Sequence, residues 1–454
     1  MEPQEILRRI YNNCDPARPA TDEQYIDFTE ARGGGNFRGA ILDQFGLAST
    51  PLCRLFTGHT GSGKSSELRR LADEMGKPNQ GRDRKRLLPV IINADDYLDI
   101  FDTDTTDLLL AITAGLAETL RTTLSVELSD DGIRRVLGDA SGFLGELRPT
   151  GEVNLPWFTV SLKRMRSEPT VRTKVRDALR PQATRLLDAL RLVFEETRQK
   201  VRAHPVAVGT PRYDDFVILV DNLEKVRRIE RRGEGTDSHR ELFIERYYQL
   251  TSLGAHVLYT VPLSLVRRSG GELRQIYKAP YVLPNVKLFE RDGSTRYQPG
   301  WDCFQAMLQK RLEPAQLLDA ISGDGLEFLL KYSGGHTRSL MQFMQDAATY
   351  AQGVVPVPLT AAHAAVRQIV PVYSTSIPAG HWQKLVQLDR PDDHQIPPDD
   401  PDYAEMLEAL TVLEYVNGGL MAEPFGTSEP WYAVNPIVRE LTQFKAAMAA
   451  ATLA

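Results

Sequence analysis

The sequence of 454 residues has little of what would tie a protein to a membrane, an oxidising compartment or a polyanion. It contains three cysteines, Cys14, Cys53 and Cys303, whose odd number and wide spacing argue against a disulfide framework and a zinc site. No run approaches the ~18 apolar residues that span a bilayer, and the first residues, MEPQEILRRIYNN, contain no apolar leader segment. The formal net charge of −6 excludes a polycation that coats nucleic acid. We therefore expect a cytoplasmic protein without a membrane partner.

The rest of the composition is that of an ordinary globular protein. Hydrophobic residues make up 42% and charged residues 25% of the chain. The length exceeds one compact core and predicts about three domains of ~100 to 200 residues each. No internal repeat of fixed period is present, so the sequence does not support a solenoid or a propeller.

The strongest pattern is the stretch LCRLFTGHTGSGKSSELRRLADEM, from Leu52 to Met75. Leu52 to Thr57 predict a short buried strand, and Leu68 and Leu71 continue after it at helical spacing. Between the two lies GHTGSGKS, which fits G-x-x-x-x-G-K-[ST]. A glycine-rich turn without a ligand is the alternative, but the order of strand, loop and helix favours a phosphate-binding loop.

The residue types of this loop are those that phosphate binding requires. Its glycines permit positive φ angles, so that backbone N–H groups and the helix N-terminus can point at an anion. Lys64 is expected to neutralise the β and γ phosphates, and the Ser65 hydroxyl is expected to take a Mg²⁺ position. We therefore predict ATP and Mg²⁺ as ligands. The residues expected to contact the nucleotide are Gly58, His59, Thr60, Gly61, Ser62, Gly63, Lys64, Ser65 and Ser66.

A second acidic motif, in DDFVILVDNLEKV, is expected to complete the site. Phe216 to Val220 form a continuous apolar run, typical of a central parallel strand buried on both faces. Asp221 falls at its carboxyl end, where open α/β sheets bind ligands, and is expected to hold Mg²⁺ through water. Glu224 is the candidate for polarising the attacking water, since Asn222 stands directly after Asp221 where a carboxylate is usual. Hydrolysis is then slow or depends on Glu224.

Other strands of the same sheet can be placed from their apolar runs. Leu87 to Ile92, His256 to Val261 and Val286 to Phe289 are the candidates, the last as the final strand. Thr260 lies where a polar side chain would contact the γ phosphate or the attacking water. Arg267 and Arg268 follow shortly after and are candidates for arginine fingers toward a neighbouring subunit, with ordinary surface arginines as the alternative.

Residues 121 to 213 are an expected insertion. The alternation of Phe158, Val160 and Leu162 predicts a strand in a small hairpin, and a long helical region interrupted at Pro181 follows. The segment 163–202 contains twelve Lys or Arg and five Asp or Glu, net +7, which leaves −13 for the rest of the chain. This contrast marks either a surface for nucleic acid or an acidic partner, or a solvated pair of helices.

The two ends of the chain carry further candidates. Tyr25, Asp27 and Arg32 precede the first strand and are candidates for adenine contacts, with a surface connection as the alternative. Arg338 lies one turn inside a helix opened by a glycine pair, as a lid arginine that senses the γ phosphate. Nearer the C-terminus, a helix at 403–410 and strands at 412–416 and 431–434 predict a winged-helix-like domain. Such domains bind DNA in some proteins and are packing modules in others.

The segments GHTGSGKSSELRRLA, DNLEK, LYTVPLSL, SGGHTR and VLEYVNGG with AVNP together resemble the bacterial STAND and AAA+-like P-loop ATPases, including those of conflict and antiphage-defence loci. The resemblance covers roughly 20–445. It implies an α/β fold of the ASCE type, with a parallel sheet, a helical lid and a C-terminal winged-helix domain. The implied ranges are 1–50 leading into the core, a core at 51–298 containing the insertion 121–213, a lid at 299–370 and the winged helix at 371–454.

The same resemblance assigns roles to single residues. It implies phosphate binding by residues 58–65, including Lys64, and Mg²⁺ coordination by Ser65 and Asp221. It also implies catalytic assistance by Glu224, because the STAND pattern tolerates a non-carboxylate after the first acid. Nucleotide sensing falls to Thr260 and Arg338.

The leading hypothesis is an ATP-dependent switch that assembles as a homo-oligomer or acts through a separate effector protein in a bacterial defence or signalling complex. The alternative is a DNA-binding loader or adaptor similar to origin-recognition ATPases, which would use the winged helix and the basic insertion. A small-molecule kinase is a third option, against which no acceptor pocket or Arg-rich lid is recognisable in the sequence.

Overall fold

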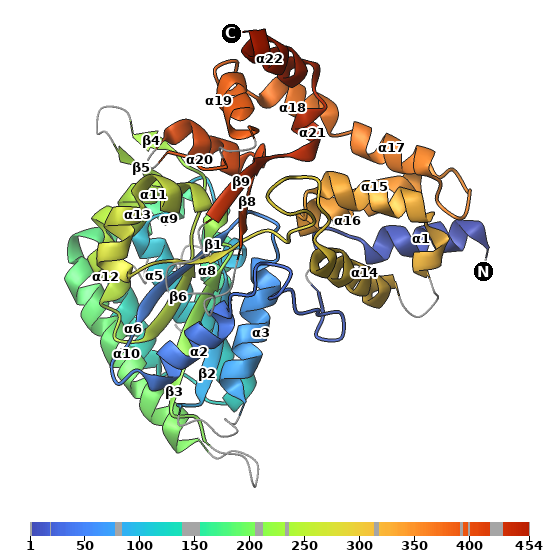
Figure 1. Cartoon of the computed structure of the whole chain (residues 1–454). Helices are drawn as coiled ribbons and strands as arrows, with labels where there is room; N and C mark the ends of the chain where they lie inside the picture. Colours follow the sequence, from blue (N-terminus) through green and yellow to red (C-terminus); the bar gives the residue numbers. More distant parts are fainter. Residues whose placement is uncertain are drawn as a thin grey trace. The chain divides into compact units, whose positions relative to one another are not determined.

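A computed structural model of the chain describes residues 2–18, 20–77, 84–138, 155–204, 212–231, 236–312, 317–390, 394–397, 400–417 and 430–453 (Figure 1). The chain divides into two compact units, which we describe separately. The sheet unit comprises Phe37–Thr57 and Glu67–Tyr281, and the C-terminal unit comprises Met1–Asn36, Gly58–Ser66 and Val282–Ala454. The domain limits inferred from the sequence stay predictions.

A five-stranded sheet with the order β2-β3-β6-β1-β7 organises the sheet unit. The pairs β1 with β6, β3 with β6, and β2 with β3 are parallel. One strand, β6, therefore separates the strand that leads into the phosphate loop from the strand that ends at Asp221, which is the order of an α/β P-loop NTPase of the ASCE type. The strands are β1 (Cys53–Gly58), β2 (Leu87–Asn93), β3 (Asp215–Asp221), β6 (His256–Thr260) and β7 (Tyr281–Leu283).

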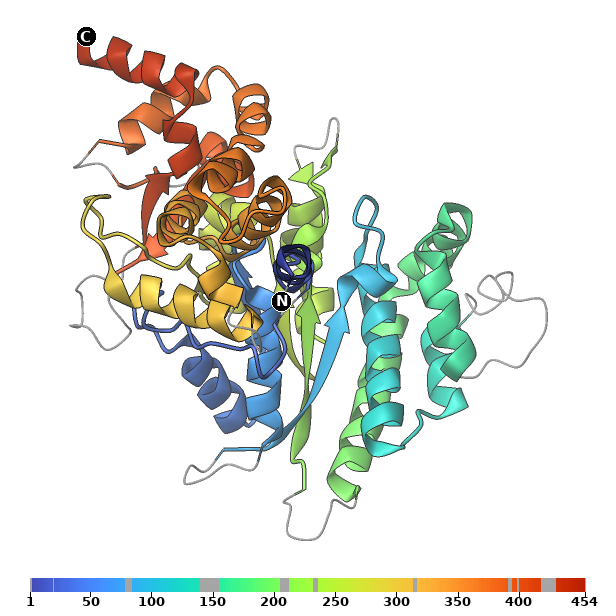
Figure 2. The ribbon, with the colours of Figure 1, turned by 90° about the vertical axis from the view of Figure 1, so that its right-hand side faces the viewer.

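Both faces of the central strand β3 are buried. In β3, alternate side chains point to opposite faces, and every residue of the strand is buried. Phe216, Ile218 and Val220 join the core cluster formed with α5 and α10, while Val217 and Leu219 are equally buried on the other face. Figure 2 shows α5 in cyan and α10 in green along one side of the strands, and the blue helices α2 and α3 along the other. The continuous apolar run in the sequence is explained by these two layers.

Helices supply the layers around the sheet. They include α2 (Phe37–Leu47), α3 (Lys64–Gly76), α4 (Ala94–Tyr97), α5 (Thr105–Leu124), α6 (Asp130–Leu137), α8 (Leu155–Met165), α9 (Pro169–Leu179), α10 (Ala183–Ala203), α11 (Ser238–Arg240), α12 (Tyr247–Thr251) and α13 (Leu263–Tyr277). A small hairpin is formed by β4 (Glu230–Arg231) and β5 (Thr236–Asp237).

The hairpin strand predicted at Phe158 to Leu162 is wrong, because these residues belong to α8. Ser161, Leu162 and Met165 are buried, whereas Val160 is 54% exposed. The apolar stripe therefore has the helical period, and a window extended to Met165 separates it from a strand. The predicted interruption at Pro181 is confirmed, since the 3-10 turn η2 (Arg180–Gln182) separates α9 from α10.

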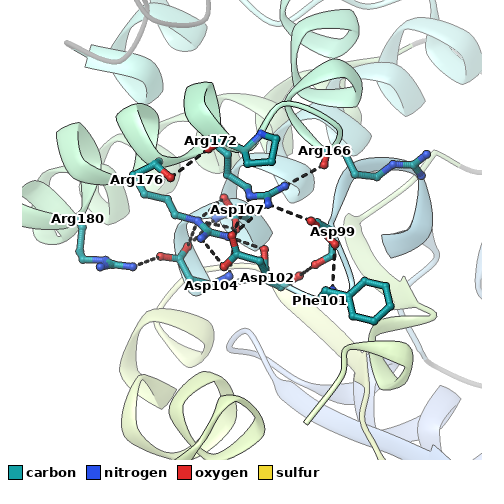
Figure 3. Close-up of polar contacts among 12 residues, drawn as sticks. Asp99, Phe101, Asp102, Asp104, Asp107, Arg166, Arg172, Arg176 and Arg180 are labelled. Carbon is teal, nitrogen blue, oxygen red and sulfur yellow. Dashed lines mark hydrogen bonds and ion pairs between the residues drawn. The ribbon is translucent and has the colours of Figure 1, made fainter. Parts of the chain in front are cut away.

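Arginines of the basic insertion pair with aspartates at the start of α5 (Figure 3). Arg172, Arg176 and Arg180 follow one another at intervals of four residues, so they lie on one side of α9 and its continuation. Arg172 Nη2 lies 2.9 Å from Asp99 and 3.0 Å from Asp102, and Arg180 Nη2 lies 2.8 Å from Asp104. These three arginines of the segment 163–202 therefore form ion pairs within the protein, and their charge is not available for a basic surface patch.

The C-terminal unit is mostly helical, as expected from Trp301 onward. Its helix α1 packs on α16, and α15, α16 and α17 pack on one another. The elements are α1 (Pro3–Asn13), α14 (Gln298–Leu312), α15 (Gly323–Ser333), α16 (Thr337–Tyr350), α17 (Leu359–Arg367), α18 (Val370–Ser376), α19 (His381–Leu388), α20 (Pro401–Glu408), β8 (Val412–Val416), β9 (Pro430–Val434), α21 (Pro436–Arg439) and α22 (Thr442–Leu453).

The two strands predicted near the C-terminus are confirmed as an antiparallel pair, β8 with β9. Tyr415 and Trp431 stack across this pair with ring centroids 4.6 Å apart. The loop predicted between the strands lies outside the described residues from Gly418 onward. Among the helices that are described, none is long and apolar enough to cross a membrane.

The final strand predicted at Val286 to Phe289 is wrong, since the last strand of the sheet is β7 (Tyr281–Leu283). After Pro284 the backbone bonds to three different segments. The N–H of Asn285 donates to Glu414, that of Val286 to Gly335 and that of Lys287 to Ala31. An apolar run that serves several neighbours in this way cannot be distinguished from a strand by its composition.

Candidate functional site

The phosphate loop follows β1 and leads into α3. Gly58, Gly61 and Gly63 have φ angles of 156°, 92° and 102°, a region that residues with a side chain rarely adopt. At Gly61 a Cβ would lie 2.7 Å from the Arg338 Cβ and 2.9 Å from the His336 Nε2. Glycine is therefore required there both by the backbone and by the close approach of α16.

Lys64 is the first residue of α3 and is buried within the loop. Its ammonium donates hydrogen bonds to the carbonyl oxygens of Gly58, at 3.1 Å, and His59, at 3.0 Å. The positive charge therefore lies at the N-terminus of α3, where two neutral carbonyl oxygens accept its hydrogen bonds. An anionic phosphate oxygen is a stronger partner for an ammonium than a peptide carbonyl.

Donors from distant parts of the C-terminal unit hold the other carbonyl oxygens of the loop. His336 Nε2 lies 2.8 Å from the Thr60 oxygen, and the backbone N–H of Arg338 donates to the Gly61 oxygen at 3.2 Å. Arg32 Nη2 donates to the Ser62 oxygen at 2.6 Å, and its Nη1 donates to the oxygen of Pro284.

This arrangement fixes which side of the loop is electropositive. In a trans peptide the N–H points opposite to the C=O. Because His336 binds the Thr60 oxygen and Arg32 the Ser62 oxygen, the N–H groups of Gly61 and Gly63 in the same two peptides point away from these donors. The N-terminus of α3 adds its partial positive charge. A face built from backbone N–H groups, a helix N-terminus and an ammonium is a site for a phosphate chain.

His336 is a neutral buried histidine. Its Nδ1 accepts the N–H of Ser339 as the N-cap of α16, so the proton is on Nε2, which donates to Thr60. Burial lowers the pKa of His336 to about 4, and the nearby charges of Arg338, Lys64 and Arg32 lower it further, against the opposing effect of the Thr60 carbonyl. Protonation would place a donor against the Ser339 N–H and a third cation near Lys64.

This pKa predicts a loss of stability in acid. A histidine whose folded pKa lies below the unfolded value stabilises fully above about pH 6.5, and this stability is lost as the pH falls toward about 4. The shift should lower the free energy of unfolding by about 2 kcal/mol between pH 7.5 and pH 5. Urea unfolding at pH 7.5 and 5 measures it. His336→Asn keeps an N-cap acceptor but does not titrate in this range, so its unfolding free energy should change less between the two pH values than that of the wild type. An equal change in both proteins would contradict the assignment of the acid loss to His336.

His59 connects the loop to two elements near the C-terminus. It is 2% exposed. Its Nε2 accepts the backbone N–H of Glu414 in β8 at 3.0 Å, so Nδ1 carries the proton and donates to the Leu407 oxygen in α20 at 3.1 Å. Both ring nitrogens are thus bound by α20 and β8, whereas the carbonyl oxygen accepts from Lys64.

Two predicted residues of this unit have contacts that the sequence did not indicate. Arg338 is the second residue of α16 and touches the loop through its backbone, while its side chain is exposed. Sensing by its guanidinium stays a prediction. Arg32 contacts the loop and Pro284, so it supports the loop, and its adenine contact stays a prediction. Adenine contacts of Tyr25 and Asp27 stay predictions.

In the sheet unit, Asp221 and Thr260 lie at the carboxyl ends of β3 and β6. The register pairs Val220 with Tyr259 and Phe56 with Thr260, so three strands end at the same edge. The Thr260 hydroxyl accepts the backbone N–H of Leu223 at 2.9 Å. Thr260 therefore fixes the turn after Asp221, which contains the half-buried Glu224.

Asn222 has a structural task at the position where a catalytic carboxylate is usual. Its φ of 63° lies in the left-handed region, which asparagine tolerates better than most residues. Its Nδ2 donates to the Asn93 Oδ1 at 2.8 Å, and that oxygen also caps α4 by accepting the N–H of Asp95. A carboxylate at 222 would face this oxygen without a proton to share. Asn222 thus ties the end of β3 to the end of β2.

Of the two arginine-finger candidates, Arg268 is engaged within its own unit. Its Nη1 lies 2.8 Å from the buried Asp237, and the side chain is 12% exposed. Reaching a neighbouring subunit would leave Asp237 with fewer partners. The role proposed for Arg267 stays a prediction.

No protein-family model matches the chain, and no curated protein matches it. Similar solved structures include the Drosophila origin recognition complex bound to DNA, at 10% identity and a TM-score of 0.37, covering 98% of this chain and 91% of the other. They also include Cdc6p from Pyrobaculum aerophilum, at 11% identity and a TM-score of 0.37, covering 97% of this chain and 98% of the other. Similarity at this level carries no functional argument, which rests on the site itself.

Proposed function

We propose that the protein is an ATP-binding P-loop NTPase that hydrolyses ATP slowly and uses it as a conformational switch. The observation that supports this most directly is the loop at 58–65. The carbonyl oxygens of Thr60 and Ser62 are bound by His336 and Arg32, so the N–H groups of Gly61 and Gly63 in the same peptides point away from these donors and form a face of backbone N–H groups. Such a face is suited to a phosphate chain and has no other evident use.

The roles follow from the chemistry of each side chain. Lys64 would bind the β and γ phosphates, and Ser65 and Asp221 would hold Mg²⁺, which when bound neutralises charge on the phosphate oxygens. Glu224 would polarise the attacking water. Thr260 and Arg338 would sense the γ phosphate.

Slow turnover is supported by the contacts of Asn222. Its amide is used to join β2 and β3, so the residue directly after Asp221 contributes no general base. The half-buried Glu224 is then the nearest carboxylate along the chain for that task.

Replacing Glu224 should therefore separate binding from hydrolysis. We expect Glu224→Gln to lower ATP turnover about a hundredfold, since a positioned general base contributes at least that much, with little change in ATP affinity. Phosphate release and calorimetric titration measure the two. Glu230→Gln is a matched control, because Glu230 is an exposed carboxylate that forms an ion pair with Arg228. Unchanged turnover in Glu224→Gln would remove Glu224 from the mechanism.

The switch is supported by hydrogen bonds that join the loop to other elements of the C-terminal unit, namely the N-cap of α16, β8 and α20. The order of α18, α19, α20, β8 and β9 suits a winged-helix domain. With the resemblance to STAND ATPases, this supports a role in bacterial defence or signalling, with output through a second copy or a partner effector. A ligand shifts such an equilibrium by its differential affinity for the two states.

Size-exclusion chromatography with light scattering, run with ATP and Mg²⁺, tests the switch. An ATP-dependent change in mass or hydrodynamic radius supports it, and identical elution in all nucleotide states contradicts it. The DNA-loader alternative is less well supported, because Arg172, Arg176 and Arg180 are used in internal ion pairs. Steeply salt-dependent DNA binding would reinstate it.

A further inference from the structure

We propose that His59 is a positioning residue that couples phosphate binding in the loop to the stability of α20 and β8. The inference rests on the proposed nucleotide function and extends it by naming the side chain that carries the signal. It needs no residue of the sheet unit.

The motif itself leaves His59 without a task in phosphate binding. In G-x-x-x-x-G-K-[ST], position 59 is one of the four unspecified positions, because the loop binds anions through backbone N–H groups. The imidazole is nevertheless 2% exposed, and both of its nitrogens are used. A buried side chain with two specific partners outside the loop indicates a second role.

The contacts form a continuous chain from the ligand side to the C-terminal elements. The Lys64 ammonium donates to the His59 oxygen at 3.0 Å. The ring of the same residue donates to Leu407 in α20 and accepts from Glu414 in β8. Glu414 is buried, and its own carbonyl oxygen accepts the N–H of Asn285, so the outer edge of β8 is fixed at this residue.

A phosphate acts on this chain at Lys64. The ammonium has three donors, and phosphate oxygens would compete with the Gly58 and His59 oxygens for them. The peptide of His59 then changes its partners, and the ring attached to it transmits the change to Leu407 and Glu414. Coupling between two such sites is reciprocal. If phosphate binding stabilises β8 and α20 by a certain free energy, their contact with His59 increases the affinity for the nucleotide by the same free energy.

Two substitutions divide the two hydrogen bonds of the ring. The amide nitrogen of Asn lies near the place of Nδ1, so His59→Asn keeps a donor for Leu407 and loses the acceptor for Glu414. The amide oxygen of Gln reaches the place of Nε2, so His59→Gln keeps the acceptor for Glu414 and loses the donor for Leu407. His59→Ala removes both. The matched control is His256→Ala, which removes another buried histidine that accepts a backbone N–H, that of Leu52 at the amino end of the sheet.

The experiment measures amide hydrogen exchange of 401–408 and 412–416, with and without a non-hydrolysable ATP analogue and Mg²⁺, on the full chain. In the wild type and in His256→Ala we expect the analogue to change exchange in both segments at least about fivefold. His59→Asn should lose the effect in 412–416, His59→Gln in 401–408, and His59→Ala in both. The analogue's Kd, measured by titration, should rise in His59→Ala by the same factor as the analogue's effect on amide exchange falls.

The outcomes separate this inference from the proposed function. If the wild type binds no analogue, the nucleotide function itself fails. If it binds the analogue and His59→Ala responds in both segments as the wild type does, the coupling through His59 is wrong and the nucleotide function stands. If His59→Ala does not fold, as judged by circular dichroism, the segment-specific losses in His59→Asn and His59→Gln decide: equal responses of the two variants in both segments would overturn the inference.

Discussion

Lys64→Ala is expected to abolish measurable ATP binding and turnover. The substitution removes a buried ammonium of the loop, which is held by the Gly58 and His59 oxygens. Truncating one partner of a buried charge pair typically costs about 2 to 5 kcal/mol, which corresponds to a rise in Kd of about 30-fold to several thousandfold. Calorimetric titration of ATP with Mg²⁺, together with phosphate release, measures both losses.

Lys77→Ala is the matched control for this variant. Lys77 follows the same helix, but its side chain is 57% exposed and forms an ion pair with Asp73 on the surface. We expect it to bind and turn over ATP as the wild type does. If Lys64→Ala bound ATP with the affinity of Lys77→Ala, the loop would not be the nucleotide site, and the proposed function would have to be abandoned.

The sheet could be predicted from the sequence because its strands are short and apolar, and the central strand β3 is buried on both faces. Leu87 to Ile92, Phe216 to Val220 and His256 to Val261 all coincide with observed strands to within a residue or two. The loop at 58–65 could be recognised equally well from the sequence, because its motif is contiguous and its conformation is local. Where an apolar run serves another purpose, as at α8 and after Pro284, the same reasoning fails.

The support of the loop could not be predicted, because it is non-local. The donors to three successive loop oxygens come from Arg32, His336 and the backbone of Arg338, which are far from the loop in sequence. His336 had a weak local signal, as a potential N-cap before a helix. Nothing in the sequence indicated its contact with Thr60.

Composition alone could not decide between a binding surface and solvated helices at the basic insertion. A net charge counts residues but does not say which of them are paired. Four aspartates lie between Asp99 and Asp107, and three arginines of α9 and η2 point at them (Figure 3). Three of the twelve Lys and Arg of the segment 163–202 therefore belong to one cluster with aspartates outside that segment.

Arg176 is at the centre of this cluster, and its removal should have the largest effect on stability. Its Nε lies 3.0 Å from the Asp107 Oδ2 and its Nη1 2.7 Å from the Asp102 Oδ1. Asp107 is buried, and its capping box with Asp104 begins α5. Arg176→Ala would leave the buried Asp107 without its guanidinium partner, and Asp102 would keep its ion pair with Arg172. Breaking a buried pair in this way costs about 3 to 5 kcal/mol.

Arg180→Ala is the control, because Arg180 is 45% exposed and contacts only Asp104 of the cluster. We expect a loss of about 1 kcal/mol or less from it. Urea unfolding followed by circular dichroism, with amide exchange of α5 and α9 to localise the change, measures both variants. Equal losses for Arg176→Ala and Arg180→Ala would show that the cluster acts as a solvated surface.

The pH dependence of Arg176→Ala supplies an independent test. Burial raises the pKa of Asp107 to about 6 even though Arg176 opposes the shift. A carboxyl with a raised folded pKa takes up a proton more readily in the folded state, so folding gains stability as the pH falls from about 6 toward 4. Without Arg176 the opposing effect disappears and the pKa should rise further. The destabilisation by Arg176→Ala should therefore be smaller at pH 5 than at pH 8, and Asp107→Asn added to it should remove that difference. A loss that is the same at both pH values would mean that the cost arises from packing and not from the buried charge.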